Sequence, residues 1–286
     1  MPILVDFNQV FISALMKQPS LHQSGVNEEM VRHMVLNMIR SYRSKYKKQY
    51  GELVLCCDNR KNWRKSFFPQ YKAHRRKLRE DSEHDWNVIF QCLNQIKTEL
   101  VENFPYKVLE VDTAEADDII GILCVYLSDV PILILSGDKD FMQLQSNSNV
   151  KQYSPIQKRF LKTDNPKKFL QEHIMRGDKG DGVPNFLSAD DTFVNNGERQ
   201  KPISKRNIAE WVKHDNPEIF CDYKMLRGYK RNQQLVDLSF VPNELQDEIR
   251  ECYDNYTDEG DEKRKYLIGY FMEKRLKNLM EHLDEF

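Results

Sequence analysis

The stretch that decides the fold is residues 108–140, VLEVDTAEADDIIGILCVYLSDVPILILSGDKD, in which two short apolar runs each lead into acids. Val108–Val111 has the pattern of a strand, and Ile132–Leu135 that of a buried strand that ends at Ser136-Gly137-Asp138-Lys139-Asp140. Residues 110–147 contain eight acids and a single lysine, a density that like-charge repulsion disfavours unless a divalent cation neutralises it. Acids that start helices in the favourable field of the helix dipole are the ordinary alternative.

The same arrangement recurs at two other predicted strands, which favours the cation. Asp6 follows the short apolar run Ile3–Val5, and Asp58 follows Leu53–Cys57. Ligands of an open parallel sheet bind outside the carboxyl ends of its strands. The acids expected to meet there are Asp6, Asp58, Glu115, Asp117 and Asp138. Carboxylate oxygens suit a hard cation such as Mg²⁺ or Mn²⁺, and the chain has no HExxH or CxxC pattern for zinc.

The net charge of −1 conceals a strong segregation of charge along the chain. Residues 40–79 contain fourteen Lys or Arg and two acids, a local charge of +12. Residues 60–79 contain no acid and interleave four aromatic side chains with the cations: Trp63, Phe67, Phe68 and Tyr71. Cations for phosphates and rings for bases are typical of nucleic-acid-binding segments. A solvated basic helix face is the common alternative, and the neighbouring acid cluster makes nucleic acid the better interpretation.

The order of elements predicts the fold class. The predicted strands are 3–6, 53–57, 107–111, 131–135, 151–154 and 159–162, the last two as an edge hairpin. The predicted helices are 9–17, 28–50, 85–103, 115–128, 139–145, 166–176, 204–214, 216–228, 230–238, 243–256 and 262–282. Alternation in the first part predicts a mostly parallel sheet with helices on both faces. We therefore expect two domains, 1–164 and a smaller all-helical 165–286, with 183–203 irregular.

Composition narrows the class of protein. No run of residues has the apolar length of a membrane span, and the first predicted strand begins too early for a signal peptide. The six cysteines lack metal or disulfide spacing, which is typical of reduced thiols. We therefore expect a soluble cytoplasmic protein without a membrane partner.

Six motifs in order resemble those of the flap-endonuclease and 5′-nuclease family, most of all its ribonuclease H branch from T-even-type bacteriophages. The motifs are Asp6, Asp58-Asn59, Tyr71-Lys72-Ala73-His74-Arg75, Glu115-Ala116-Asp117-Asp118, Ser136-Gly137-Asp138-Lys139-Asp140-Phe141 and Gly177-Asp178-Lys179-Gly180-Asp181. The resemblance covers nearly the whole chain. It implies a PIN-like sheet domain, an arch over the active site at about 59–82, and a helix–three-turn–helix module that binds duplex DNA.

The resemblance also implies a site with two divalent cations, Mg²⁺ with Mn²⁺ as a substitute. The first would be held by Asp6, Asp58, Asp117 and Asp138, with Glu115 close by. The second would lie near Asp140, Asp178 and Asp181, and Asp118 is expected in the same cluster. Lys72 and Arg75 match basic residues beside the scissile phosphate, and with Asp138 and Asp140 they form the expected catalytic set.

Contacts to nucleic acid are expected from two groups of side chains. The first group belongs to the basic segment and the helix before it: Arg40, Arg43, Lys61, Arg64, Lys65, Tyr71, Lys72, Arg75 and Arg76. The second group clusters on and beyond the irregular stretch: Lys179, Lys201, Lys205 and Arg206. Many relatives continue their Gly-Asp-x-x-Asp turn with a second glycine pair whose carbonyls hold a monovalent cation. This chain has Gly182-Val183-Pro184-Asn185-Phe186-Leu187-Ser188 instead, so the resemblance does not extend to that cation site.

The implied function is metal-assisted hydrolysis of phosphodiester bonds at the 5′ ends of RNA–DNA or DNA duplexes, including 5′ flaps and RNA primers. The expected form is a monomer, with a single-strand-binding protein or a sliding clamp as candidate partners. A non-catalytic protein that binds branched DNA, with metal only holding its fold, is the main alternative. A small-molecule phosphohydrolase is a third, disfavoured because Asp6-Phe7-Asn8 lacks the second Asp of an aspartyl-phosphate mechanism.

Overall fold

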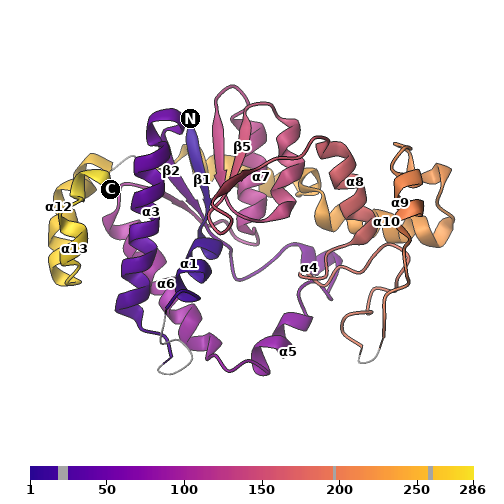
Figure 1. Ribbon diagram of the computed structural model, residues 1–286, viewed down its shortest axis with the longest axis horizontal. Helices are drawn as coiled ribbons and strands as arrows, with labels where there is room; N and C mark the ends of the chain where they lie inside the picture. The colour runs from indigo at the N-terminus through magenta and orange to yellow at the C-terminus, as the bar shows by residue number, and fades with distance from the viewer. Residues whose placement is uncertain (19–24, 196–197, 257–259) are drawn as a thin grey trace.

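The computed structural model describes residues 1–18, 25–195, 198–256 and 260–286 and contains a six-stranded sheet between two layers of helices (Figure 1). The strands lie in the order β3-β2-β1-β4-β5-β6, and every neighbouring pair is parallel except β5 with β6. They are β1 (Pro2–Asp6), β2 (Glu52–Cys56), β3 (Lys107–Leu109), β4 (Ile132–Leu135), β5 (Val150–Ser154) and β6 (Arg159–Leu161). The predicted α/β class, parallel sheet and edge hairpin are confirmed.

The helices fall into those that cover the sheet and those that extend beyond it. Up to β5 they are α1 (Phe7–Leu15), α3 (Glu28–Tyr50), α4 (Arg64–Phe67), α5 (His74–Glu80), α6 (Trp86–Asn103), α7 (Ala116–Tyr126) and the 3₁₀ helix η1 (Lys139–Ser146). After β6 they are α8 (Pro166–Arg176), α9 (Lys205–Trp211), η2 (Pro217–Ile219), α10 (Tyr223–Val236), η3 (Leu238–Phe240), α11 (Asn243–Asp254), α12 (Gly260–Glu273), α13 (Lys277–Met280) and η4 (Leu283–Glu285). None of the helices within the described ranges is long and apolar enough to cross a membrane.

Four predicted helices differ from the observed ones. Residues 139–145 form a 3₁₀ helix rather than an α-helix. The helix predicted at 216–228 begins only at Tyr223, because Asp222 caps its start by accepting a hydrogen bond from the backbone N–H of Met225, and it continues through the helix predicted at 230–238 as one helix, α10. Residues 217–219 form the separate 3₁₀ helix η2. The helix predicted at 262–282 is divided into α12 and α13 at Arg275, whose φ of 56° is left-handed and ends the first helix.

Successive side chains of each strand point to opposite faces of the sheet, and a hydrophobic core lies on each face. Ile3 and Val5 point to a layer made by α1, α3 and α6, whereas Leu4 between them points to α7, η1 and α11. Residues of β2 and β4 alternate in the same way, so the sheet is buried on both faces. Burial on both faces fixes the register of the strands, and the register fixes where each strand-end acid lies.

The last helices complete both cores. In one layer, Phe104 at the end of α6 contacts the ring of Phe286 with 5.7 Å between centroids, and Phe286 contacts Phe271 of α12 at 5.1 Å. In the other layer, Leu245 and Ile249 of α11 pack in the core below α7. The segment from residue 238 onward therefore belongs structurally to the sheet, while α8 to α10 form the part that extends beside it (Figure 1).

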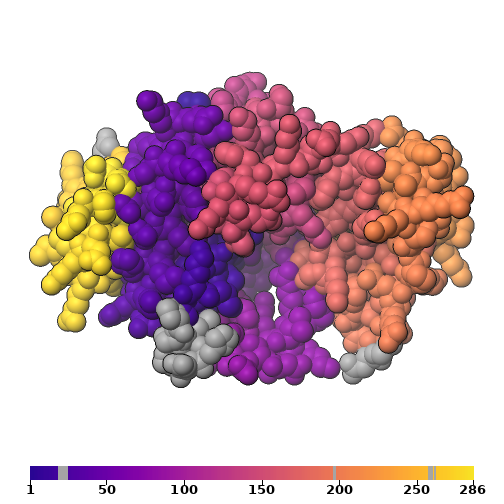
Figure 2. Space-filling model, in the orientation of Figure 1, coloured from indigo at the N-terminus to yellow at the C-terminus, as the bar shows by residue number. Residues whose placement is uncertain are grey.

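The basic segment spans the open side of the molecule. In Figure 1 the chain leaves β2, passes through α4 and α5 and returns through α6, so that α5 lies apart from the sheet. Figure 2 shows the molecular surface hollowed between the α5 segment and the elements above it. The helix α5 has no buried side chain, which is consistent with an element that crosses a gap instead of covering a core.

We expect Gly228→Ala to destabilise the protein, because a Cβ there would lie 2.0 Å from the carbonyl oxygen of Phe186 and neither backbone can yield without disturbing α10. Overpacking of this kind costs about 1–3 kcal/mol of unfolding free energy. Gly269→Ala in α12 is the matched control, since a Cβ there meets nothing within 4 Å and alanine favours a helix. Urea unfolding measures both, and equal unfolding midpoints for the two variants would contradict the packing described.

Candidate metal centre and nucleic-acid interface

The acids at the strand ends lie at one edge of the sheet. Asp6 ends β1 and caps α1, where its Oδ1 accepts a hydrogen bond from the backbone N–H of Gln9 at 3.0 Å. Strand β1 pairs with β2 on one side and with β4 on the other. Asp58, which follows β2, and Asp138, which follows β4, therefore lie on the two sides of Asp6.

Hydrogen bonds fix these carboxylates relative to one another. The hydroxyl of Ser136 donates to Oδ2 of Asp6 at 3.0 Å and accepts from the backbone N–H of Asp138 at 3.0 Å. Oδ1 of Asp58 accepts from the backbone N–H of Ala116 at 2.8 Å, so the end of β2 is tied to the first turn of α7. That link places Asp117, the next residue of α7, at the same edge.

Burial and mutual repulsion disfavour the ionised forms of these acids. Burial, with Asp58 as the next contributor, raises the pKa of Asp6 to about 7. Burial also raises the pKa of Asp58, with Glu115 adding to the effect. The pKa of Asp117 is raised by burial and then by Asp138 and Asp6. Carboxylates in this condition gain most from a nearby cation, which removes the repulsion and restores their charge.

Glu115 is in a different electrostatic state from its neighbours. Burial alone would raise its pKa, but Lys72 and Arg64 outweigh burial and lower that pKa to about 2. The ammonium of Lys72 donates to Oε1 of Glu115 at 2.5 Å, and the guanidinium of Arg64 donates to Oε2 at 3.2 Å. Glu115 is therefore already neutralised by the basic segment and stands beside the acids that are not.

The structure corrects the role expected for Asp118. Its side chain is completely buried, and both oxygens accept hydrogen bonds from Arg64, at 2.7 Å and 3.0 Å. Oδ2 accepts two more, from the indole N–H of Trp63 and from the backbone N–H of Glu115. With its oxygens occupied in this way, Asp118 is a positioning residue that fixes the start of α7 to α4, not a free metal ligand.

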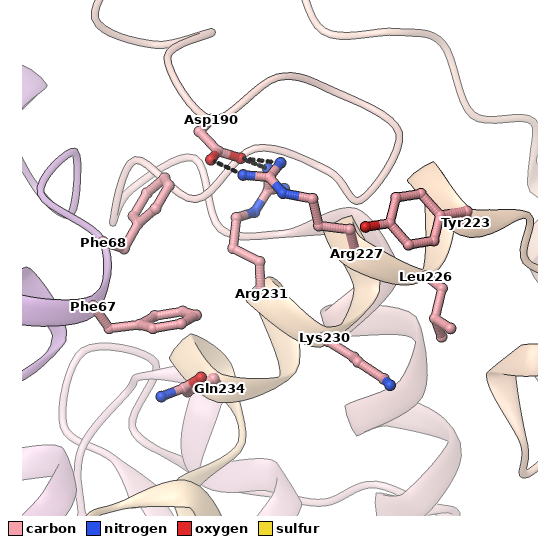
Figure 3. Close-up of a pocket in the computed structure, with 9 residues that line it drawn as sticks. All are labelled: Phe67, Phe68, Asp190, Tyr223, Leu226, Arg227, Lys230, Arg231 and Gln234. Atoms are coloured by element: carbon pink, nitrogen blue, oxygen red, sulfur yellow. Dashed lines mark hydrogen bonds and ion pairs between the residues drawn. The ribbon is translucent and has the colours of Figure 1, made fainter.

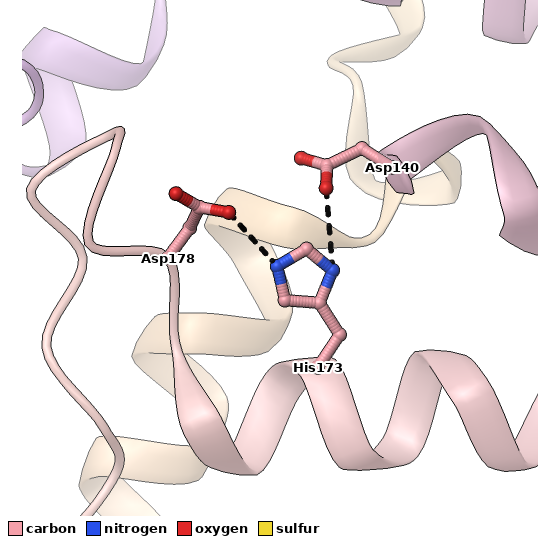
Figure 4. Close-up of side chains that lie close together, drawn as sticks. All are labelled: Asp140, His173 and Asp178. Atoms are coloured by element: carbon pink, nitrogen blue, oxygen red, sulfur yellow. Dashed lines mark hydrogen bonds and ion pairs between the residues drawn. The ribbon is translucent and has the colours of Figure 1, made fainter. Parts of the chain in front are cut away.

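A second group of ligands lies between η1 and α8 (Figure 4). The ring of His173 stands between two carboxylates, with Nε2 3.2 Å from Oδ2 of Asp178 and Nδ1 3.4 Å from Oδ1 of Asp140. The ammonium of Lys139 also lies 2.8 Å from Oδ2 of Asp178. Burial raises the pKa of Asp140 to about 7, with Asp138 adding to the effect and His173 opposing it.

His173 was missed by the sequence analysis. Seven histidines are scattered singly along the chain, and a lone histidine carries no spacing signal. The signal that could have found it is helical geometry: His173 lies in the last turn of α8, five residues before Asp178, with Gly177 between them ending the helix. The left-handed Gly177, with a φ of 66°, ends α8 and turns the chain, so that Asp178 lies beside the side chain of His173.

Asp181 joins the basic segment to this turn. Its carboxylate accepts hydrogen bonds from the hydroxyl of Tyr71 and from the guanidinium of Arg75, each at 2.7 Å. The backbone N–H of Lys72, which has a φ of 56°, donates to the carbonyl of Asp181 at 2.8 Å. The hydroxyl of Tyr71 also reaches Glu115 at 2.8 Å, so this segment spans both groups of acids.

The structure also corrects part of the expected nucleic-acid contacts. Arg43 and Arg64 are 4% and 2% exposed and are held by carboxylates, and Tyr71 is equally buried. These three side chains stabilise the fold or the acid cluster and cannot contact a phosphate at the surface. Arg40 is mostly buried and paired with Glu285. The exposed members of the first group are Lys61, Lys65, Arg75 and Arg76, with Lys72 partly exposed.

The second group of cations expected to contact nucleic acid is exposed to solvent. Lys179, Lys201, Lys205 and Arg206 are exposed, and none of them forms an ion pair with any residue that the structure describes. Between Lys179 and Lys201 the chain contains no helix or strand in residues 184–195 and 198–200, in agreement with the predicted irregular stretch.

A buried arginine organises that irregular stretch. Arg231 of α10 is 5% exposed and lies among the backbone carbonyls of the loop. Its guanidinium donates to the carbonyl oxygens of Pro184, Asn185 and Ser188 and to a carboxylate oxygen of Asp190, at 2.7 to 3.2 Å. A fixed positive charge thus occupies the centre of the loop where the expected second glycine pair is absent.

Both halves of the chain match known families of nucleases. Residues 2–174 match the family described as "5′-3′ exonuclease, N-terminal resolvase-like domain", and residues 167–286 match "T4 RNase H, C terminal". The ribonuclease H of Enterobacteria phage T4 is 33% identical over 294 residues, which cover 99% of this chain and 95% of the relative. A flap endonuclease Xni from Shewanella piezotolerans is 29% identical over 133 residues, covering 43% of this chain and 48% of the relative.

Solved structures with low sequence identity share the fold. The flap endonuclease D15 of bacteriophage T5, crystallised as a product complex with DNA and metal ions, superposes with a TM-score of 0.65 at 17% identity. That match covers 88% of this chain and 98% of the T5 chain. The T5 D15 protein crystallised with metal ions superposes with a TM-score of 0.60 at 16% identity, covering 96% and 98%.

We predict that Arg64→Met destabilises the protein, because it leaves Asp118 buried without its partner. Breaking a buried ion pair in this way costs about 3–5 kcal/mol of unfolding free energy. The adjacent Lys65→Met removes an exposed cation and is expected to change that free energy by no more than about 0.5 kcal/mol. Chemical unfolding without metal gives both values. A loss for Arg64→Met no larger than that for Lys65→Met would contradict the positioning role of Asp118.

Proposed function

The chain belongs to the 5′-3′ exonuclease family, and from that premise we propose that it hydrolyses phosphodiester bonds at the 5′ ends of RNA–DNA and DNA duplexes with two divalent cations. The single observation that carries the proposal is the cluster of carboxylates at one edge of the sheet, Asp6 and Asp58 at strand ends and Asp117 in the first turn of α7, which are tied together by hydrogen bonds and whose pKa values are raised. Carboxylates crowded in this way without a cation destabilise the fold. Cations bound among them would remove this destabilisation and form the catalytic site.

The residues present fit divalent cations. The donors are almost all carboxylate oxygens, which Mg²⁺ prefers, and Mn²⁺ accepts the same ligands as well as an imidazole. Oδ1 of Asp140 and Nδ1 of His173 are buried and face each other at 3.4 Å, and neither forms a hydrogen bond with any of the described residues, so both are open to a cation. We propose Mg²⁺ as the working ion and Mn²⁺ as its substitute.

The proposed ligands divide between the two groups of acids. Asp6, Asp58, Asp117 and Asp138 would hold the first cation, with Glu115 beside them; Asp140, Asp178 and Asp181 would serve the second, with His173 as a nitrogen donor. When bound, the cations would supply Lewis-acid chemistry, lowering the pKa of a water molecule and stabilising negative charge on the phosphate oxygens. The protein contributes rigidity, because Ser136 and the backbone of Ala116 fix the carboxylates from behind.

Lys72 and Arg75 are proposed to act on the phosphate. Lys72 lies between Glu115 and Asp181, 3.5 Å from Oδ1 of Asp181, and Arg75 is hydrogen-bonded to the same carboxylate. Both side chains are therefore held at the edge of the acid cluster before a substrate arrives. Positive charge placed there stabilises the nonbridging oxygens as their charge grows in the transition state.

The proposed substrates are duplexes with a free or single-stranded 5′ end. The relatives named ribonuclease H and flap endonuclease support RNA–DNA hybrids and 5′ flaps, and removal of RNA primers during replication follows as the proposed role. We further propose a monomer that works in the cytoplasm of an infected host, as the similarity to a phage protein suggests. A single-strand-binding protein or a sliding clamp would be its replication partner.

We propose that residues 1–164 carry catalysis and that 165–286 supply the grip on the duplex, chiefly through α8 to α10 and the loop between them. The exposed cations Lys179, Lys201, Lys205 and Arg206 surround this loop. Because Arg231 already holds the carbonyls of the loop, duplex binding would not depend on which monovalent cation is in the buffer. The last helices of this part also complete the cores of the sheet.

The first prediction for this function concerns Asp138. Asp138→Asn should abolish cleavage in Mg²⁺ and leave DNA binding equal or tighter, because it removes a negative charge that faces the phosphate. Asp112→Asn, at an exposed acid paired with Lys61, should leave cleavage unchanged. Single-turnover cleavage and binding in chelator measure the two effects. Near-normal turnover of Asp138→Asn would overturn the assignment of the cation ligands.

The second prediction separates rate from affinity. Arg75→Ala should lower the single-turnover rate about 10²-fold, the scale for loss of one preorganised charge-stabilising donor. The neighbouring Arg76→Ala removes a cation that is 87% exposed, so we expect weaker binding at low salt with the single-turnover rate unchanged. If both variants lost only affinity, Arg75 would be an ordinary contact to the phosphate backbone.

The third prediction concerns the duplex grip. Replacing Lys201, Lys205 and Arg206 together by Ala should lower the salt slope of duplex binding by about two to three units, since each phosphate contact contributes roughly 0.9. The control replaces Lys265 and Lys277, two exposed cations of the C-terminal helices, and should leave the slope unchanged. A salt titration of duplex affinity gives the slopes. An unaltered slope in the triple variant places the duplex elsewhere.

A further inference from the structure

A pocket of about 470 Å³ lies between the end of α4 and one side of α10, outside the acid cluster (Figure 3). Side chains from the basic segment form one wall, and a stripe of α10 forms the other. The stripe follows the helical period, because residues 223, 226, 227, 230 and 234 fall on one face. The proposed catalytic site uses none of these residues.

The first wall presents an aromatic ring to solvent. Of the four rings in the basic segment, Trp63, Phe68 and Tyr71 are buried, whereas Phe67 is 44% exposed. Figure 3 shows its ring extending from α4 toward α10. Phe68 beneath it packs in a small core with Tyr71 and with Leu235 of α10, so the backbone that carries Phe67 is fixed. The pocket therefore has one rigid, half-exposed stacking surface.

The pocket carries net positive charge. Its lining contains three cations, Arg227, Lys230 and Arg231, and one acid, Asp190. Asp190 accepts hydrogen bonds from both arginines, at 2.6 Å and 3.2 Å from Arg227 and at 2.7 Å from Arg231, so its charge is more than compensated. Lys230 is exposed and has no ion-pair partner in the described parts of the chain. An anionic ligand is therefore favoured.

A nucleotide matches all parts of the lining. A base can stack on Phe67, the amide side chain of Gln234 offers a donor and an acceptor for a base edge, and Arg227 and Lys230 offer positive charge to a phosphate. A second ring, that of Tyr223, stands 86% exposed at the far end of the stripe. Such exposure of two large rings beside cations is typical of single-strand-binding surfaces.

The position of the pocket relates it to the substrate. Phe68 packs against Tyr71, whose hydroxyl donates to both Glu115 and Asp181. The pocket and the acid cluster thus lie against the same short segment, Phe67 to Tyr71. We propose that this pocket binds one unpaired nucleotide of the substrate strand, with its base on Phe67 and its phosphate at Lys230 and Arg227. This inference rests on the proposed function.

The test uses a short single-stranded oligodeoxynucleotide that carries 2-aminopurine, bound to the full-length protein in chelator so that no cleavage occurs. Phe67→Ala should weaken binding about fivefold or more and abolish the quenching that stacking causes. Lys230→Gln should keep the quenching and lower the salt slope of binding by about one unit. Tyr266→Ala and Lys265→Gln, an exposed ring and an exposed cation on α12, are the matched controls and should change neither quantity.

Two results would overturn the pocket assignment. One is unchanged quenching and affinity in Phe67→Ala. The other is displacement of the oligonucleotide by an acidic peptide of equal charge as readily as by unlabelled oligonucleotide, because the pocket would then select charge alone. Cleavage of a flap duplex by the unaltered protein in Mg²⁺ tests the proposed function separately. If the unaltered protein cleaves the flap but Phe67→Ala changes neither quenching nor affinity, only the pocket assignment is wrong. If Phe67→Ala loses quenching but the unaltered protein does not cleave the flap, only the proposed function is wrong.

Discussion

The repulsion among buried carboxylates at one edge of a parallel sheet is the constraint on which the rest of this structure depends. The register of β1 with β2 and β4 places Asp6, Asp58 and Asp138 side by side, and the hydrophobic burial of both sheet faces prevents the strands from slipping to relieve the crowding. Burial raises the pKa of Asp6, and the neighbouring carboxylate of Asp58 raises it further. Packing thus forces the acids together, and a cation bound among them would remove their repulsion.

The basic segment has two roles that its composition alone does not separate. Arg64 faces inward and neutralises Glu115 and Asp118, while Lys72 neutralises Glu115 and stays partly exposed at the edge of the acid cluster. Other side chains of the segment, such as Lys65 and Phe67, are exposed. A single short segment therefore sets the electrostatics of the acid cluster and presents an exposed surface beside it.

The parts that the sequence predicted are those whose signal is local. Strand-end acids such as Asp58 and Asp138 come soon after apolar runs. The alternation of predicted strands and helices along the chain indicates a parallel sheet. Contacts between distant residues carry no such signal: Arg64 meets Asp118 across 54 positions, so the sequence placed it on the surface with the other cations. The same reason hid His173, whose partner Asp140 lies on another element.

The most direct test of this account is to locate Mn²⁺ in crystals of the protein by anomalous scattering. The account predicts two sites, one in contact with Asp6, Asp117 and Asp138, and the other beside Asp140, His173 and Asp178. Two peaks there would show that the crowded acids exist to bind cations. Crystals that hold no Mn²⁺ at this edge of the sheet, while the same preparation cleaves a 5′ flap in Mn²⁺, would contradict it.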